Sequence, residues 1–195
     1  MGQFQRRRGQ VVLTLDAYEI ELLLALFGEL TGLLQEGLDE APGPSSSDDP
    51  FAVWEQSFST EPTLEDPDFL DPDPITRRLF PDAYHDDPAA SADFRRYTDG
   101  DARRAKLDAI EVVLDDLRKA DRAGRIEVPA AHHHAWMTSL NNLRLVLSVV
   151  LGITDEISAD EAAKRPDSDP KGVIHHYYSW LGWLLESLMS AITGD

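Results

Sequence analysis

The stretch PAAHHHAWMTSLNNLRLVLSVVLG, residues 129–152, decides the fold of this chain. Its first residue, Pro129, suits the opening turn of a helix, and its last, Gly152, suits the left-handed residue that ends one. Apolar side chains recur between them at helical spacing, and the second half of the stretch is apolar on nearly every side. A helix of that kind has to be enclosed by other helices, so the stretch predicts a mainly α-helical bundle.

The helices that would enclose it are predicted from their own patterns. Residues 16–37 form one helix, because Asp16 and Glu19 have the spacing of a capping box and are followed by apolar residues at helical intervals. Residues 101–122 form another, with one apolar stripe against a charged face. Further helix starts are predicted at two Asp-Pro pairs and after a polar spacer, at residues 73, 87 and 170.

Two segments depart from this helical pattern. Residues 4–13 place apolar residues on both sides of Gly9, which predicts a small N-terminal β-hairpin. Residues 39–73 are rich in proline and acidic residues, which predicts a long acidic, mobile and partly disordered loop. Aromatic residues within it would either dock on a partner or cover the core. The predicted fold is a single domain over residues 1–195, with its helical body at 74–192.

Charge and composition exclude several functions. The formal net charge of −18 disfavours direct binding of DNA, because the phosphate backbone would be repelled. The chain has no cysteine, so disulfides, thiolate metal sites and thiol switches are excluded. The longest apolar run, 143–153, is interrupted by Arg144 and is too short to span a bilayer, and no signal peptide is recognisable. We therefore expect a cytoplasmic protein that binds neither nucleic acid nor membrane.

Histidines supply the pattern for a metal site. His132 and His133 open one predicted helix, and His175 and His176 open another, so side chains from both could converge on a divalent metal. Adjacent histidines on a helix point about 100° apart, whereas helical metal pairs are usually three or four residues apart. We therefore predict neither a metal nor another cofactor. A metal-dependent enzyme that uses these histidines is the alternative function.

A carboxylate pair supplies the other catalytic pattern. Asp86 and Asp87 could act as general acid and base, but Asp87 precedes Pro88 and is better explained as a helix cap. No nucleophile elbow and no glycine-rich phosphate loop accompany the pair. The sequence therefore predicts a protein that is not an enzyme.

Two groups of polar residues predict fixed contacts. The first is a basic patch, which would either hold a partner's carboxylate or phosphate or pair with nearby aspartates: Arg77, Arg78, Arg95, Arg96, Arg103 and Arg104. The second consists of Asn141, Asn142 and Arg144 on an apolar helix. These would either bind a small ligand or satisfy backbone groups of a neighbouring segment.

The last predicted helix carries aromatic residues on two sides. Its leucine stripe faces inward, and His176, Trp180 and Trp183 lie on the opposite side at spacings of four and three residues. Two tryptophans on that side need to be covered by the acidic loop, by a second copy of the chain in a homodimer, or by a different protein. We predict a protein interface at this face.

Several of these motifs resemble one family. They are RLFPDAYHDD at 78–87, which includes Phe80, Pro81 and Tyr84, then Phe94-Arg95, Trp136, and the segment at 140–145. These residues are similar to the AosR-type actinobacterial proteins, long classed as a domain of unknown function. The resemblance implies an oxidative-stress transcriptional regulator that contacts a sigma factor or RNA polymerase. Asn142 stands where the family pattern has an aspartate, and the lack of cysteine removes thiol sensing. We therefore predict a regulatory protein-interaction module.

Overall fold

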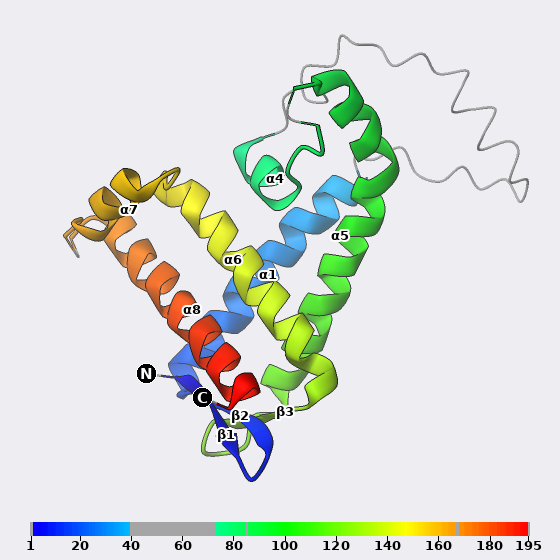
Figure 1. The fold of residues 1–195 in the computed structure, drawn as a ribbon. Coiled ribbons are helices and arrows are strands. Elements are labelled where there is room, and N and C mark those ends of the chain that lie inside the picture. Colours follow the sequence, from blue (N-terminus) through cyan, green and yellow to red (C-terminus); the bar gives the residue numbers. More distant parts are fainter. Residues whose placement is uncertain (1, 40–72, 85, 167, 195) are drawn as a thin grey trace, which may run out of the picture.

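Helices form most of the molecule, and three short strands lie at one end (Figure 1). The computed structural model describes residues 2–39, 73–84, 86–166 and 168–194, so nearly all of the predicted acidic loop lies outside the described residues. The elements in chain order are β1 (Gln3–Arg7), β2 (Gln10–Thr14), α1 (Ala17–Asp39), α4 (Pro74–Leu79), α5 (Pro88–Arg118), β3 (Arg125–Val128), the 3-10 turn η1 (Ala130–His132), α6 (His133–Leu151), α7 (Glu156–Ala163) and α8 (Pro170–Thr193).

Helix α6 lies at the centre of the bundle, as its apolar sequence predicts. Trp136 and Leu140 are fully buried in its first half, and Leu143 follows them on the same side. Helices α8, α5, α4 and α1 all contact α6. In Figure 1, α6 lies between α5 and α8 and in front of α1. The prediction of a mainly α-helical bundle is confirmed.

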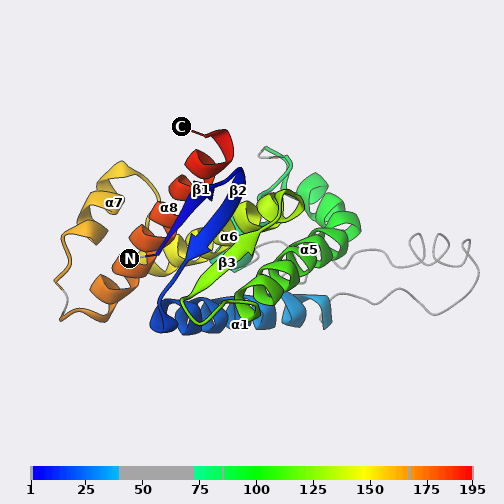
Figure 2. The same ribbon diagram turned by 90° about the horizontal axis from the view of Figure 1, so that it is seen from below.

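The N-terminal hairpin is confirmed, but it belongs to a larger sheet. Strands β1 and β2 pair antiparallel across a turn in which Arg8 and Gly9 both have positive φ, of 53° and 86°. Strand β3 adds an antiparallel third strand on the other edge of β2, with Val11 opposite Val128. β1 lies beside α8 and β3 beside α5 (Figure 2). We did not predict β3, because its four residues show too short an alternation to identify a strand.

Helix α5 corrects another prediction. The sequence suggested a helix opening at Asp87-Pro88 and a separate one over 101–122, yet α5 runs unbroken through Gly100 and ends at Arg118. A glycine inside a helix costs about 1 kcal/mol relative to alanine. Packing of α5 against α1 and α6 offsets that cost, and such long-range contacts leave no local pattern.

Helix α7 lies where a polar spacer was predicted at 154–170. Asp155 caps it, since the amide of Ser158 donates to Asp155 Oδ1 at 2.8 Å and Ser158 Oγ accepts from the Asp155 amide at 2.9 Å. Only Ala162 of this helix is buried. A helix with so little apolar surface has almost no periodicity to detect, which explains the missed prediction.

The predicted capping box at α1 is confirmed and has a second role. The amide of Glu19 donates to Asp16 Oδ1 at 2.8 Å, and the Asp16 amide donates to Glu19 Oε2 at 2.9 Å. The other carboxylate oxygen of Glu19 accepts from the amide of Gly2 at 2.6 Å. One buried side chain therefore caps α1 and fixes the residue that leads into β1.

Within the described residues, no single helix is both long and apolar enough to cross a bilayer. Residues 130–151 together with α7 meet the length and composition criteria only as a pair bent by 81°.

Gly124, in the turn before β3, supports a testable prediction. Its φ is 71°, its carbonyl accepts from the Leu15 amide at 2.9 Å, and a Cβ at this position would collide with the carbonyl oxygen of Leu15. Gly152 has a similar φ of 76° but open space around it. We expect Gly152→Ala to cost about 1–2 kcal/mol of unfolding free energy, from the backbone alone. Gly124→Ala should cost about 1–3 kcal/mol more, because of the collision.

Urea unfolding of the two variants and the parent chain measures this difference. Equal losses for the two alanine variants would contradict the predicted contact between the turn and Leu15.

Candidate protein-interaction site

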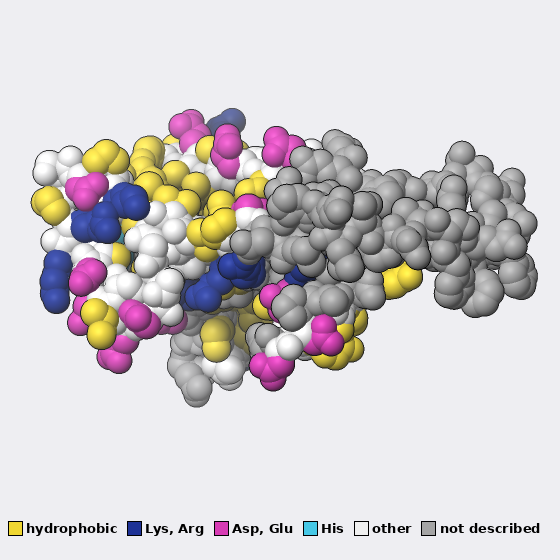
Figure 3. Space-filling view, turned by 90° about the horizontal axis from the view of Figure 1, so that it is seen from above, with side chains coloured by type: hydrophobic (Ala, Val, Ile, Leu, Met, Phe, Trp, Pro, Cys, Tyr) yellow, Lys and Arg dark blue, Asp and Glu magenta, His cyan; other side chains and the backbone are white. Residues whose placement is uncertain are grey.

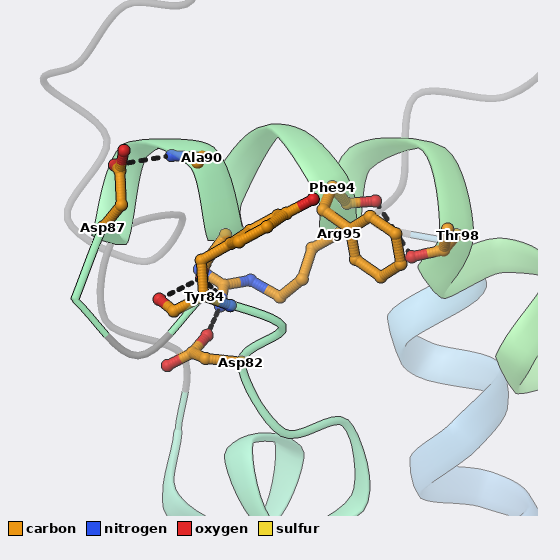
Figure 4. A network of polar contacts seen from close by, with 8 residues as sticks. Asp82, Tyr84, Asp87, Ala90, Phe94, Arg95 and Thr98 are labelled. Carbon is orange, nitrogen blue, oxygen red and sulfur yellow. Dashed lines mark hydrogen bonds and ion pairs between the residues drawn. The ribbon is translucent and has the colours of Figure 1, made fainter.

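The described residues between α4 and α5, 80–84 and 86–87, form a junction that joins the two helices. One aspartate caps the start of each of these helices. Asp73 Oδ1 accepts from the amides of Ile75 and Thr76, at 2.9 and 3.2 Å. Asp87 Oδ1 accepts from the Ala90 amide at 3.0 Å, as predicted for a cap (Figure 4). The carboxylate of Asp87 is thus committed to a helix end, whereas Asp86 is exposed.

Within the junction, a serine and an ion pair hold the turn against α5. The hydroxyl of Ser91, which is 1% exposed, donates to the carbonyl of Tyr84 at 2.8 Å and accepts from the Tyr84 amide at 3.0 Å. The guanidinium of Arg95 pairs with Asp82 (Figure 4). The ring of Tyr84 packs edge to face with Phe94 at 6.2 Å. These contacts fix the position of residues 82–84 against α5, and with them the position of α4, which comes just before.

Phe80 links the junction to the bundle through two cations. The ring is buried, with Arg103 Cζ at 4.7 Å and Lys106 Nζ at 5.3 Å from its centroid. Lys106 Nζ also donates to Asn142 Oδ1 at 3.1 Å, and burial lowers the pKa of Lys106. Helices α4, α5 and α6 therefore meet through one aromatic ring, one amine and one amide.

The polar residues Asn141, Asn142 and Arg144 of α6 have different surroundings. Asn142 is 3% exposed and binds the side chain of Lys106 rather than a neighbouring backbone, while Asn141 is exposed. Arg144 Cζ lies 4.9 Å from the centroid of the Tyr178 ring, and its Nη2 donates to the Tyr178 hydroxyl at 3.4 Å. Asn142 and Arg144 therefore both join α6 to a neighbouring helix.

The predicted basic patch is not one surface. Arg95 pairs with Asp82, the buried Arg103 stacks on Phe80, and Arg104 pairs with Asp101 at 2.6 Å. Pairing with nearby aspartates, one of the two alternatives, is seen for Arg95 and Arg104. The side chain of Arg96 lies outside the described residues. Arg77 and Arg78, in the last turn of α4, are exposed.

A groove runs between α4 and the C-terminal end of α6, and we call it the α4–α6 groove. Its volume is about 640 Å³, and it is lined by Pro74, Arg77, Arg78, Pro81, Leu145, Val149, Gly152, Ile153 and Thr154. Aliphatic side chains of α6 form its floor and the two arginines belong to α4. Basic side chains lie beside hydrophobic ones on this end of the molecule (Figure 3). Sequence reasoning identified the arginines but missed Leu145, Val149 and Ile153, which read as ordinary core positions.

The tryptophan face requires a correction. Trp180 is 5% exposed and belongs to the core, although we predicted that it faced a partner. Strand β1 packs against α8, and the amide of Phe4 donates to Ser187 Oγ at 3.1 Å, so the N-terminal strand covers this side of the helix. Trp183 is 45% exposed, and its Nε1 donates to the carbonyl of Gly2 at 3.2 Å. His176 is exposed.

The histidines do not converge on one point. His132 and His133 lie where α6 begins, near β3, whereas His175 and His176 lie where α8 begins, at the opposite end of the bundle (Figure 1). His132 Nδ1 is 2.9 Å from Oδ2 of the buried Asp116, a contact that the sequence did not suggest. Among the described residues, no three histidine or carboxylate side chains are grouped to hold a metal. The geometry required for the alternative, a metal-dependent enzyme, is therefore missing from this part of the chain.

Comparison with known proteins identifies relatives along nearly the whole chain. A family described as a domain of unknown function (DUF2017) matches residues 1–192. A Mycobacterium leprae protein named as a proposed oxidative stress regulator, AosR, is 31% identical over 188 residues, which cover 90% of this chain and 79% of the relative. The oxidative stress regulators AosR of Mycobacterium bovis and Mycobacterium tuberculosis are each 28% identical over 195 residues, covering 93% of this chain and 82% of theirs. No solved structure matches the chain.

The contact between Asn142 and Lys106 supports a testable prediction. Asn142→Leu removes the acceptor of a half-buried ammonium group and should cost about 1–3 kcal/mol of unfolding free energy. Asn142→Asp should cost less, because a carboxylate there would face the ammonium. Asn141→Leu and Asn141→Asp, at the exposed neighbouring position, should change stability by about 0.5 kcal/mol or less.

Urea unfolding at several pH values measures these effects and adds a pH signature. Burial lowers the pKa of Lys106 below 10.5, so the unfolded chain binds this proton more tightly than the folded chain. The contribution of Lys106 to stability should therefore rise as pH increases towards 10.5, and Asn142→Asp should reduce that rise. Equal destabilisation by Asn142→Asp and Asn142→Leu would contradict the assigned contact.

Proposed function

The chain belongs to the DUF2017 family, and we propose that it acts as a non-enzymatic regulator of the response to oxidative stress by binding another protein. The names of the mycobacterial relatives support the regulatory role, since each describes an oxidative stress regulator. Those names give no mechanism. The mode of action is therefore inferred from the geometry of this chain.

The observation that carries the proposal is the α4–α6 groove. Leu145, Val149 and Ile153 offer an apolar floor, and Arg77 and Arg78 stand beside it. Apolar pockets with arginines at their edge are typical of surfaces that bind an amphipathic peptide segment. The junction of Asp82, Tyr84 and Arg95 holds α4 in place, so the groove is fixed before a partner arrives.

We assign this groove to an amphipathic segment of a sigma factor or of RNA polymerase, the partners that the family resemblance implies. Its apolar residues would fill the floor, and its carboxylates would pair with the guanidinium groups of Arg77 and Arg78. Because both arginines are exposed to water, ion pairs with them would add little to the affinity of the complex. They would mainly determine which partner binds.

The distribution of charge supports action through a protein rather than directly on DNA. Nine of the 36 acidic residues and none of the 18 basic residues lie between positions 40 and 72. The negative charge of this chain repels the phosphate backbone of DNA. In the proposed function, the chain therefore reaches a promoter only by binding another protein.

The absence of cysteine constrains how an oxidative signal reaches the chain. With no thiol in the sequence, a disulfide or sulfenic acid cannot form on this protein. In the proposed function, the signal arrives through the partner or through a ligand.

Charge reversal at the groove tests the proposal. Purified sigma factor and core polymerase from the native organism would be titrated against the tagged full chain, and Arg78→Glu is expected to weaken binding of one of them about tenfold or more. Arg104→Glu is the matched control, because Arg104 is also exposed and lies on α5 away from the groove. Both variants should keep the circular dichroism spectrum and thermal midpoint of the parent.

A second pair of variants tests the apolar floor. Val149→Asp should abolish binding, whereas Ile157→Asp, at a residue that is 73% exposed on α7, should leave it intact. Binding that survives both groove variants would reject the groove as the docking site. Failure of the parent chain to bind either sigma factor or polymerase would reject the proposed partners.

A further inference from the structure

A second pocket lies at the opposite end of the molecule from the α4–α6 groove, and we call it the sheet pocket. It has a volume of about 860 Å³ and is lined by the hairpin, the last turn of α5, the loop into β3 and the start of η1. That volume is within the range of about 300–1,000 Å³ that is usual for small-ligand sites. Val12 of β2, which is buried, contributes an apolar side chain to its lining.

Four cationic side chains line the sheet pocket in a chain that is strongly acidic. They come from three different segments of the fold: Arg7 and Arg8 from the hairpin, Lys119 from the end of α5, and Arg125 from β3. Arg8 is held at a φ of 53°, a conformation that two-residue hairpin turns usually give to asparagine or glycine. Its guanidinium has no partner among the residues that the structure describes.

Two of the three carboxylates in the pocket wall are already committed to internal bonds. Asp116 is buried, and its Oδ2 accepts from Trp136 Nε1 at 3.1 Å and lies 2.9 Å from His132 Nδ1. Asp121 Oδ1 accepts from the amides of Ala123 and Arg125, at 2.7 and 2.9 Å, and these backbone bonds lower the pKa of Asp121. The third, Glu127, is exposed on β3.

Because Asp116 and Asp121 are hydrogen-bonded to other groups, the cations of the pocket remain able to bind a ligand. Lys119 Nζ and Arg125 Nε each approach an aspartate only at 3.7 Å, and both side chains are more than half exposed. Arg7 donates to Gln5 Oε1, a neutral group. With Nδ1 of His132 turned to Asp116, Nε2 is the ring nitrogen left to meet a ligand.

We propose that the sheet pocket binds a small molecule that carries phosphate groups. Several guanidinium groups from different segments match the geometry of phosphate oxygens, which arginine binds through paired hydrogen bonds. The acidic surface of the chain favours a small ligand over a nucleic acid, because it repels a long polyanion. This inference is independent of the proposed docking groove.

Calorimetric titration of the full chain with pyrophosphate tests the proposal, at constant ionic strength and in the absence of divalent cations. ATP and a 12-nucleotide single strand are titrated in parallel. The parent chain is expected to bind pyrophosphate or ATP saturably, and Arg8→Gln and Arg125→Gln should each weaken binding about tenfold. Arg104→Gln, at an exposed arginine paired on α5, should bind like the parent.

Each contrary result overturns a defined part of the proposal. No saturable heat with pyrophosphate or ATP, or equal affinity in Arg8→Gln, Arg125→Gln and Arg104→Gln, would reject the site. Tighter binding of the oligonucleotide than of ATP, lost in Arg8→Gln, would identify a surface for nucleic-acid phosphates and would reject the small ligand. Arg8 is exposed and has no hydrogen bond or ion pair among the described residues, so its replacement should leave the fold intact, which the thermal midpoint verifies.

Discussion

Enclosing α6 is the constraint on which the rest of the structure depends. A helix that is apolar on nearly every side needs neighbours on several sides, and α8, α5, α4 and α1 all pack against α6, leaving Leu145 and Val149 to line the α4–α6 groove. Three polar side chains of α6 bind residues of neighbouring helices. Trp136 Nε1 donates to Asp116, Asn142 accepts from Lys106, and Arg144 binds Tyr178. The first two pairs join α6 to α5 and the third joins it to α8, and together they fix the rotation of α6 about its axis.

The same constraint places the two candidate surfaces at opposite ends of the bundle. Where α6 ends, the short α4 crosses it and leaves the apolar α4–α6 groove, with Arg77 and Arg78 beside it. Where α6 begins, the sheet closes the bundle, and its outer face carries the cations of the sheet pocket. A ligand in one and a protein in the other would act on the two ends of one buried helix. That arrangement provides a physical route for coupling between them, through the packed residues of α6.

The features that could be predicted from the sequence are those that depend on residues close together along the chain. The α6 segment, the capping box of Asp16 and Glu19 and the cap at Asp87 follow from patterns within a few residues. Features that depend on distant contacts were not predictable in this way. The sequence predicted separate helices starting at 87 and 101, but tertiary packing keeps α5 continuous, and it predicted an interface at Trp180, but that side chain is buried in the core. In the same way, Arg77 and Arg78 were identified from composition, whereas the groove beside them exists only because α4 packs against the end of α6.

The central claim is that the α4–α6 groove is the surface that a partner covers. Hydrogen exchange of the full chain, measured alone and bound to the sigma factor or polymerase that it captures, tests this claim most directly. The account predicts added protection in residues 74–84 and at the C-terminal end of α6, with the amides of α8 around Trp183 unchanged. Protection confined to α8 or to the hairpin, with no change in α4, would contradict it.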